Sequence, residues 1–306
     1  MDGWIIIDKP VGTGSTPCVS AVKRALREGG YPRRKVGHGG TLDPLASGVL
    51  PIAVGEATKL TGRMLGADKV YDFTCRFGEE TDTLDAEGQV VATSPVRPGD
   101  DAIAAVLPRF TGPIEQVPPA FSALRIDGER AYKRARAGEA VEMTPRAVTI
   151  HDLAIVGTGA DFATFRARVS KGTYIRSLAR DIARALGTVG HVTMLRRTKA
   201  GPFTLDGAIS LDKLAEIAKA RALENVTLPL TAGLDDIPAL SVTPDQAGAL
   251  REGRVLIGIA APSGAHPAGL HLAIEGDIPV ALVEVSQAGM RVVRGFNPAM
   301  SKEEDA

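Results

Sequence analysis

The sequence predicts an α+β protein, and three observations support that fold class. Helical and strand patterns follow one another without the regular βαβ repeat of a parallel sheet. Residues 70–77 and 165–169 alternate apolar and polar side chains, as half-buried strands do. Residues 173–186 repeat apolar side chains at helical spacing. With 306 residues, 44% of them hydrophobic, the chain can form one substantial core and a small second domain.

Turn residues and apolar spacing place the remaining elements. Ser15 or Thr16 is expected to cap the first helix, with Pro17 in its first turn. Residues 229–238 are expected to form a linker, and the glycine-rich segment 239–297 a small β-rich domain. The elements expected before the linker also include a buried strand at 3–8, a helix ending near residue 28, a glycine-rich loop at 37–48, a strand at 50–54 and a helix at 56–65.

Charge is unevenly distributed, although 36 basic residues balance 36 acidic ones. Residues 23–38 contain six basic residues against Glu28 alone, and residues 163–201 contain nine against Asp181 alone. Phosphate binding depends on the local surface rather than on the total charge. Both segments are therefore candidate contacts for a nucleic acid, although solvated surface charge explains such clusters equally well.

Three arginines, Arg176, Arg180 and Arg184, lie four residues apart on the helix expected at 173–186. Like charges at this spacing repel one another, which suggests an anionic partner. An ordinary exposed helix face is an equally good explanation of this row.

Composition also bears on compartment and cofactors. No apolar run approaches the roughly 18 residues that a membrane span needs, and the first residues lack the pattern of a signal peptide. Cys18 and Cys75 form neither a disulfide framework nor a metal-ligand spacing, and the five histidines are scattered. We therefore expect a cytoplasmic protein with no membrane contact and no metal site.

Asp43 is the strongest candidate for chemistry. It lies in the glycine-rich loop between Leu42 and Leu45, and Pro44 disfavours helix at its position. The surrounding glycines permit tight turns and close backbone approach. Local features alone favour the alternative that Asp43 merely organises its own turn.

The loop at 37–51 closely resembles the catalytic motif of the TruB family of tRNA pseudouridine synthases, and the likeness extends over residues 3–210. Two departures, Gly-Gly after His38 and Thr-Gly-Ser-Thr at 13–16, affect only the expected packing beside the loop. Further matching motifs occur in the family's order at 9–12 (Lys-Pro-Val-Gly), 69–71 (Lys-Val-Tyr), 78–88, 118–124, 170–178 and 195–197 (Leu-Arg-Arg).

The resemblance implies a mixed, largely antiparallel central sheet with flanking helices. It implies a catalytic domain at 1–235 with an RNA-gripping insertion at about 118–145. A small PUA-like domain at 236–306, ending in a disordered acidic tail, would follow. The expected substrate is the T stem-loop of tRNA, and a monomer would act on it without cofactor or protein partner.

The resemblance also assigns the catalytic roles. Asp43 would act at the ribose, either adding to C1′ or removing a ribose proton. Arg176 would pair with Asp43, its alternative being a phosphate contact. Tyr71 would stack on the extracted base and is a candidate for the C5 proton, unless it is plain core. Leu195 would form the apolar floor under the base, or equally be ordinary core.

Substrate binding is assigned to residues of the matching motifs and of the insertion. His38 would help to fill the space left by the flipped base, although a structural histidine is nearly as good a reading. The remaining expected contacts are Lys9, Tyr174, Arg125, Arg134 and Arg136.

The predicted function is isomerisation of uridine to pseudouridine at position 55 of the T loop. One alternative is a tRNA-binding folding helper, which needs the basic surface but not Asp43. Another is a carboxylate hydrolase of the glycosidase type, which needs a second acid. Only Glu79, Asp82 and Asp85 offer one, in a segment that reads as an acidic turn.

Overall fold

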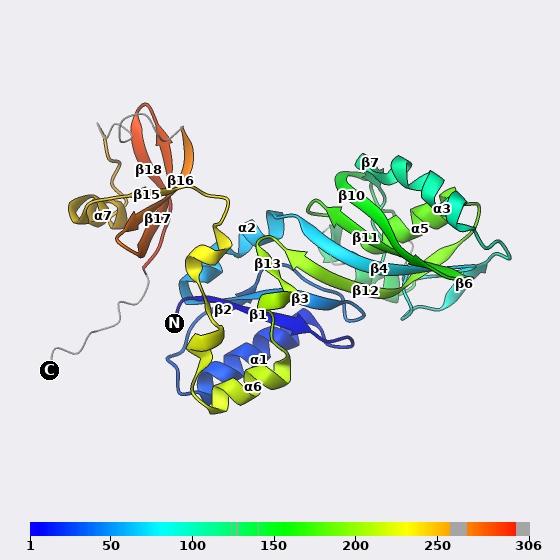
Figure 1. Cartoon of the computed structure of the whole chain (residues 1–306), viewed down its shortest axis with the longest axis horizontal. Helices are drawn as coiled ribbons and strands as arrows, with labels where there is room; N and C mark the ends of the chain where they lie inside the picture. Colours follow the sequence, from blue (N-terminus) through cyan, green and yellow to red (C-terminus); the bar gives the residue numbers. More distant parts are fainter. Residues whose placement is uncertain (123, 127, 140, 258–267, 298–306) are drawn as a thin grey trace.

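The computed structural model describes residues 1–297 except 123, 127, 140 and 258–267. At Arg125 it describes only the backbone. It has the predicted α+β architecture, with a large and largely antiparallel sheet, flanking helices and a separate smaller sheet (Figure 1). The acidic tail predicted to be disordered lies outside the described residues.

The large sheet forms the centre of the molecule. In the described residues β3 and β12 run parallel, whereas the other neighbouring strands are antiparallel. Two short strands, β2 (Val36–His38) and β13 (Phe203–Thr204), pair with β3 and β12. The strand order is β14 (Leu228–Pro229), β1 (Gly3–Lys9), β3 (Ser47–Val54), β12 (Gly190–Ala200), β4 (Lys69–Phe77), β11 (Phe162–Val169), β10 (Arg146–Thr158) and β7 (Gly112–Gln116).

Helices cover one face of this sheet and bury its main core. Ile5 and Ile7 of β1 point to that face, whereas Trp4 and Ile6 point to a second core on the other. Because both faces of β1 are buried, its sequence is continuously apolar, as the buried strand predicted at 3–8 requires. The helices that contribute to the main core are α1 (Ser15–Glu28), α3 (Asp100–Val106), α5 (Ile175–Ala185) and α6 (Leu211–Lys219).

A four-stranded sheet with one helix follows, so the predicted small β-rich unit is present. Its hydrophobic core is separate, although Leu272, Leu282 and Phe296 also pack in the second core with Trp4. The boundary at residues 235 and 236 stays a prediction. The elements of this unit are β15 (Ala239–Ser241), α7 (Pro244–Arg251), β16 (Gly269–Glu275), β17 (Ile278–Ser286) and β18 (Gly289–Gly295).

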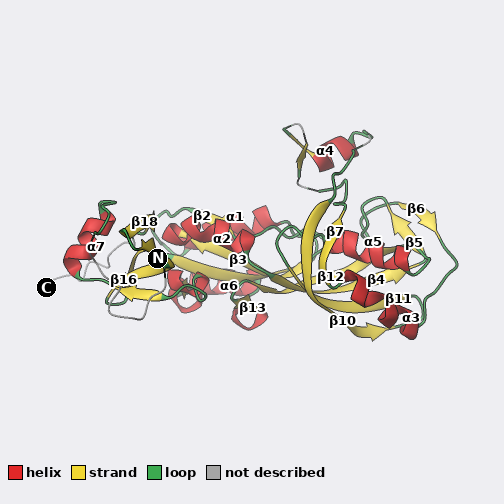
Figure 2. Ribbon diagram, turned by 90° about the horizontal axis from the view of Figure 1, so that it is seen from above, coloured by secondary structure: helices red, strands yellow, loops and turns green. Residues whose placement is uncertain are grey.

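Smaller elements complete the fold, and one group projects from the body. Figure 2 shows α4 at the tip of that projection, which is the insertion expected at about 118–145. The smaller elements are β5 (Glu79–Thr81), β6 (Val90–Thr93), β8 (Arg125–Ile126), β9 (Glu129–Arg130), α4 (Ala131–Arg136) and 3₁₀ helices at Gly55–Leu60, Leu107–Phe110, Leu205–Gly207, Leu223–Val226 and Leu230–Gly233.

Two expectations about helices are wrong. Gly14 occupies the N-cap of α1 without a side-chain capping bond, because the Ser15 hydroxyl bonds to Leu42 instead of capping the helix. The helix expected at 56–65 is a 3₁₀ turn followed by α2 (Thr61–Gly66). Thr58 Oγ1 and Thr61 Oγ1 each donate to the carbonyl three residues earlier, which competes with regular α-helical bonding.

The prediction of a linker at 229–238 is wrong for the first half of that segment. Strand β14 pairs with β1, and the buried side chains of Leu230 and Leu234 pack in the second core. Trp4 Nε1 donates to the Leu230 carbonyl at 3.2 Å. The segment contains two prolines and one glycine, but the leucines between them anchor it.

Candidate active site

The loop that carries Asp43 joins β2 to β3 and is fixed on both sides of the aspartate. The Ser15 hydroxyl accepts a bond from the Leu42 amide at 2.8 Å and donates to its carbonyl at 3.0 Å. On the other side, Lys9 Nζ donates to the Pro44 carbonyl at 3.2 Å. Backbone contacts therefore set the position of Asp43 independently of its side chain.

Arg197, in the Leu-Arg-Arg motif, holds both ends of this loop. It is 1% exposed, and it donates to the carbonyls of Gly40 at 3.0 Å, Thr41 at 3.3 Å and Val49 at 2.8 Å. At Gly48, φ is +103°, and a Cβ there would lie 2.1 Å from the Arg197 carbonyl oxygen. Glycine is required where the backbone of the loop approaches β12 so closely.

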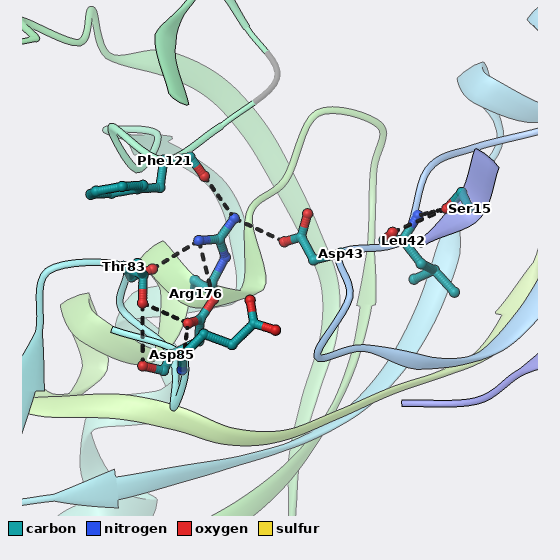
Figure 3. A network of polar contacts seen from close by, with 8 residues as sticks. Ser15, Leu42, Asp43, Thr83, Asp85, Phe121 and Arg176 are labelled. Atoms are coloured by element: carbon teal, nitrogen blue, oxygen red, sulfur yellow. Dashed lines mark hydrogen bonds and ion pairs between the residues drawn. The ribbon is translucent and has the colours of Figure 1, made fainter. Parts of the chain in front are cut away.

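Arg176 binds Asp43 from the first turn of α5 (Figure 3). Its Nη2 donates to Asp43 Oδ2 at 2.8 Å and to the Phe121 carbonyl at 3.0 Å. Its Nη1 donates to the Thr83 carbonyl at 2.8 Å and lies 3.3 Å from Asp85 Oδ2. The Arg176 side chain is 7% exposed and that of Asp43 45%. The expected ion pair is present, and the carboxylate stays open toward solvent.

Sequence reasoning considered Asp85 only as a possible second acid of a hydrolase and missed that it is the second carboxylate on Arg176. Its side chain is 4% exposed, and Oδ1 accepts bonds from Thr83 Oγ1 at 2.6 Å and from the Glu87 amide at 3.1 Å. The preceding Leu84 has φ of +62°, an uncommon conformation that shapes the turn. The matching motif at 78–88 was the available signal, but the segment was interpreted as an acidic turn.

A cavity of about 370 Å³ opens beside Asp43 and Arg176. Tyr71 on β4 and the buried Leu195 on β12 contribute to its walls, as does Tyr174 at the N-cap of α5. Its volume falls within the range of small-molecule sites. The structure therefore brings five predicted site residues together around one cavity.

Lys9 is placed differently from the expectation. It is 0% exposed, and its ammonium donates to the carbonyls of Pro10, Thr13 and Pro44. Burial lowers the pKa of this ammonium. A group enclosed in this way cannot contact RNA directly, so the expected substrate contact is corrected to a role in holding the catalytic loop.

His38 and Tyr174 line different cavities, both of which Asp43 borders. His38 lines a neighbouring cavity of about 570 Å³, which shares Asp43 with the first, and burial lowers the pKa of its ring. Tyr174 lines the first cavity, and burial raises the pKa of its phenol. The Tyr174 amide donates to Gln116 Oε1 at 2.7 Å, which joins α5 to the base of the insertion.

The insertion arginines have contacts of their own. Arg134 Nε donates to Glu139 at 2.8 Å, and the Arg136 guanidinium lies 5.5 Å from the centre of the Tyr132 ring. Arg136 also lines the 570 Å³ cavity. The side chain of Arg125 lies outside the described residues. Of the two arginines whose side chains are described, Arg136 is the one that lines a cavity beside the site.

The row of arginines on α5 is not a free cationic face, because its members pair with acidic side chains, so the row by itself does not indicate an anionic partner. Arg180 pairs with Asp181 at 2.8 Å, and Arg184 pairs with Glu80 at 2.9 Å. Other basic residues of 163–201 also have acidic partners within the chain. These pairs are Arg166–Asp72, Arg168–Asp68 and Arg196–Asp8.

The basic segment at 23–38 differs in this respect. Within the part of the chain that the structure describes, none of its six basic side chains forms an ion pair. This segment borders a separate cavity of about 930 Å³. We call the cationic lining of that cavity the basic surface. Its cationic residues are Lys23, Arg27, Arg33, Arg34 and Lys35.

Two other features are absent from the part of the chain that the structure describes. No group of three or more His, Cys, Asp or Glu side chains could hold a metal ion. No helix in the same residues is long and apolar enough to cross a membrane.

Lys69 closes the C-terminal end of α2 beside the cavity. Its ammonium donates to the carbonyls of Met64 at 2.9 Å, Leu65 at 2.8 Å and Ala67 at 2.5 Å. Burial, with a smaller effect of Arg197, lowers the pKa of Lys69 to about 8.

This lowered pKa predicts a stability effect at high pH. Keeping Lys69 charged inside the fold costs free energy below pH 8, and the cost disappears as the pH rises from 8 toward 10.5. Relative to Lys69→Met, the wild type should gain about 2 kcal/mol of unfolding free energy over that window, allowing for partial solvent screening. Urea unfolding of both proteins at pH 7 and pH 10 measures this, and a pH-independent difference would contradict it.

Comparison with known proteins places the chain in a family. Residues 27–175 match the profile of the "TruB family pseudouridylate synthase (N terminal domain)", and residues 176–235 match that of the "tRNA pseudouridylate synthase B C-terminal domain". The chain belongs to the TruB family. The predicted family and enzyme class, a pseudouridine synthase, are thereby confirmed.

Relatives of this TruB chain cover nearly its whole length. A tRNA pseudouridine synthase B of Novosphingobium aromaticivorans is 61% identical over 97% of this chain and 98% of its own. That of Zymomonas mobilis is 60% identical over 97% and 96%. A solved H/ACA ribonucleoprotein bound to a substrate RNA containing 2′-deoxyuridine matches with a TM-score of 0.72 and 25% identity, over 97% of this chain and 85% of the solved chain. The fold predicted from the sequence is confirmed.

Proposed function

We propose that the protein isomerises uridine to pseudouridine at position 55 in the T loop of tRNA, with Asp43 as the catalytic carboxylate. The observation that carries this is the placement of Asp43, which is open to solvent, is held by the buried Arg176 and borders a cavity of about 370 Å³, large enough to admit a nucleobase. The names of the most similar relatives, tRNA pseudouridine synthase B, support the substrate.

The reaction breaks the bond between uracil N1 and C1′ and forms one between C5 and C1′. The proton lost from C5 is balanced by one gained at N1, so the product is an isomer. Asp43 acts at the ribose carbon, while Tyr71 and Leu195 keep the detached base in the cavity as it turns. Tyr71 is also our candidate for handling the C5 proton.

A uridine in a folded loop must leave its stack before Asp43 can reach it. The cavity that contains His38 and Arg136 adjoins the first across Asp43 and is suited to neighbouring nucleotides of a bent loop. The projecting insertion would then close over the RNA, which is recognised by shape and by splayed bases. We place this activity in the cytoplasm and assign it to a monomer without protein partners.

The glycosidase alternative lacks its second acid. Asp85 is buried and faces the opposite side of the Arg176 guanidinium from Asp43. The Asp82 carboxylate accepts the Gln89 amide and organises its own turn. Neither carboxylate is placed to protonate a leaving group or activate water at the sugar that Asp43 attacks.

The direct test is to incubate unmodified tRNA transcripts with the protein and to map pseudouridine along them. We expect conversion at position 55 and none in a transcript carrying cytidine there. Conversion at another position would refute the assigned target, and no conversion would leave the folding-helper alternative in its place.

The basic surface should contribute to tRNA affinity. Changing Arg27 and Arg33 together to Ala should weaken binding and reduce the slope of log K against log salt by about 0.9 per lost phosphate contact. Arg184→Ala is the matched control, because Arg184 is already neutralised by Glu80. Binding titrations between low and moderate salt measure both, and equal slopes for all three proteins would contradict the assignment.

A further inference from the structure

The first turn of α5, which carries Arg176, lacks the side-chain contacts that usually fix the start of a helix. Tyr174 occupies the N-cap, and in the described part of the chain its side chain makes no capping bond. The first turn contains no acidic residue, and Arg176 is itself a cation at the positive end of the helix dipole. The position of Arg176 therefore depends on contacts from elsewhere in the fold.

Gln116 supplies such a contact at the helix start. Its Oε1 accepts a bond from the N-cap amide, that of Tyr174, at 2.7 Å. In a capping box the residue at N3 makes this bond, as Gln246 does for α7 at 2.9 Å. The N3 residue of α5 is Ser177, whose hydroxyl instead donates to the Val117 carbonyl at 2.8 Å. A side chain 58 residues earlier thus takes the place of the helix's own capping residue.

Gln116 is held rigidly and buried. It is the last residue of β7, lies opposite Arg146 of β10 and is 1% exposed. Because the Tyr174 amide can only donate, the bonded atom is the amide oxygen of Gln116. Its Nε2 makes no hydrogen bond in the described residues. A buried amide with an unbonded donor costs free energy of folding, so stability alone does not account for a glutamine at this position.

We propose that Gln116 is a positioning residue for pseudouridine formation and that it acts through Arg176. The bond to the N-cap amide fixes where α5 begins, and two residues later the Arg176 side chain reaches out to bind Asp43 at 2.8 Å. Without that bond the guanidinium fork shifts relative to Asp43, and a displacement of about 1 Å can lower a rate by up to about a hundredfold. This inference rests on the proposed function, in which Asp43 is the catalytic carboxylate.

The test uses Gln116→Met, which keeps the length of the side chain and fills the same space but removes the acceptor. Under single-turnover conditions on unmodified tRNA, the rate of pseudouridine formation should fall about tenfold to thirtyfold. Affinity for tRNA should stay within about threefold, because the side chain is buried. Gln116→Glu keeps an acceptor for the Tyr174 amide, whether charged or protonated, and should retain the wild-type rate within about threefold.

Two comparisons separate positioning from a structural role. Ser177→Ala is the matched control, because it also removes a bond between α5 and the segment of Gln116, while the Val117 carbonyl keeps the bond from Arg180 at 3.1 Å. Its rate should equal that of the wild type. The second comparison places Gln116→Met in the Arg176→Lys background, where the guanidinium fork is already absent. There the further loss of rate should be less than about twofold.

An unchanged rate in Gln116→Met would overturn the proposal, and so would an equal loss in Ser177→Ala or in a folded Gln116→Glu. A full additional loss in the Arg176→Lys background would overturn it as well, since Gln116 would then act independently of Arg176. Thermal unfolding shows which variants are folded, and the double variant decides if Gln116→Glu is not. Failure of the proposed function shows separately, as absence of pseudouridine from tRNA treated with the unaltered protein.

Discussion

Asp43→Asn should lower the rate of pseudouridine formation by at least about four orders of magnitude, as loss of a group that bonds the reacting centre does in other enzymes. RNA affinity should stay within about threefold, because asparagine keeps the shape of the side chain and the loop is held by its backbone. Single-turnover assays and binding titrations on the same tRNA measure the two effects.

The matched control is Asp82→Asn, which removes a carboxylate from the acidic turn without touching either cavity beside Asp43. Its rate should equal that of the wild type. A normal rate of pseudouridine formation by Asp43→Asn would contradict the catalytic assignment. Lost RNA binding in Asp43→Asn would instead show that the residue serves recognition.

Arg176→Lys should reduce kcat by about two to three orders of magnitude with a smaller change in KM. A lysine keeps the charge but cannot reach Asp43, Asp85 and two carbonyls with one planar fork, so Asp43 loses its orientation. Steady-state kinetics on full-length tRNA measure both constants. An unchanged kcat would show that the loop alone positions the carboxylate.

Asp85→Asn tests whether the second carboxylate on Arg176 also affects kcat. Asparagine can still accept from Thr83 and the Glu87 amide, but it no longer balances the charge of Arg176. We expect about a tenfold to hundredfold loss of kcat, between the wild type and Arg176→Lys, together with lower stability. A kcat equal to that of the wild type would show that the buried carboxylate serves stability alone.

Local patterns predicted the regular elements because each carries its own signal. The apolar run of β1 and the alternation of β4 appear in the structure where they were expected. The cap of α1 was not predictable in this way, because Ser15 bonds to Leu42, 27 residues away. The residues of 229–238 likewise gave no local sign that Leu230 and Leu234 are buried.

Residues of the candidate site were predicted where a family motif contains them. Roles that depend on how distant segments pack together were missed. Asp43, Tyr71 and Arg176 lie on three separate elements, and only the resemblance linked them before the fold was known. Lys9 belongs to an equally good motif, yet its burial gives it a different role. The α5 arginines show the same limit, since their acidic partners Glu80 and Asp85 come from a segment about 90 to 100 residues earlier in the chain.

The bonds between α5 and the base of the insertion make that insertion modular. Gln116, Val117 and Phe121 are each bonded to the first turns of α5, to Tyr174, Ser177 and Arg176 respectively. The projecting tip beyond residue 124 carries none of these bonds. Its length and sequence could therefore change without breaking the three bonds that tie the base of the insertion to α5.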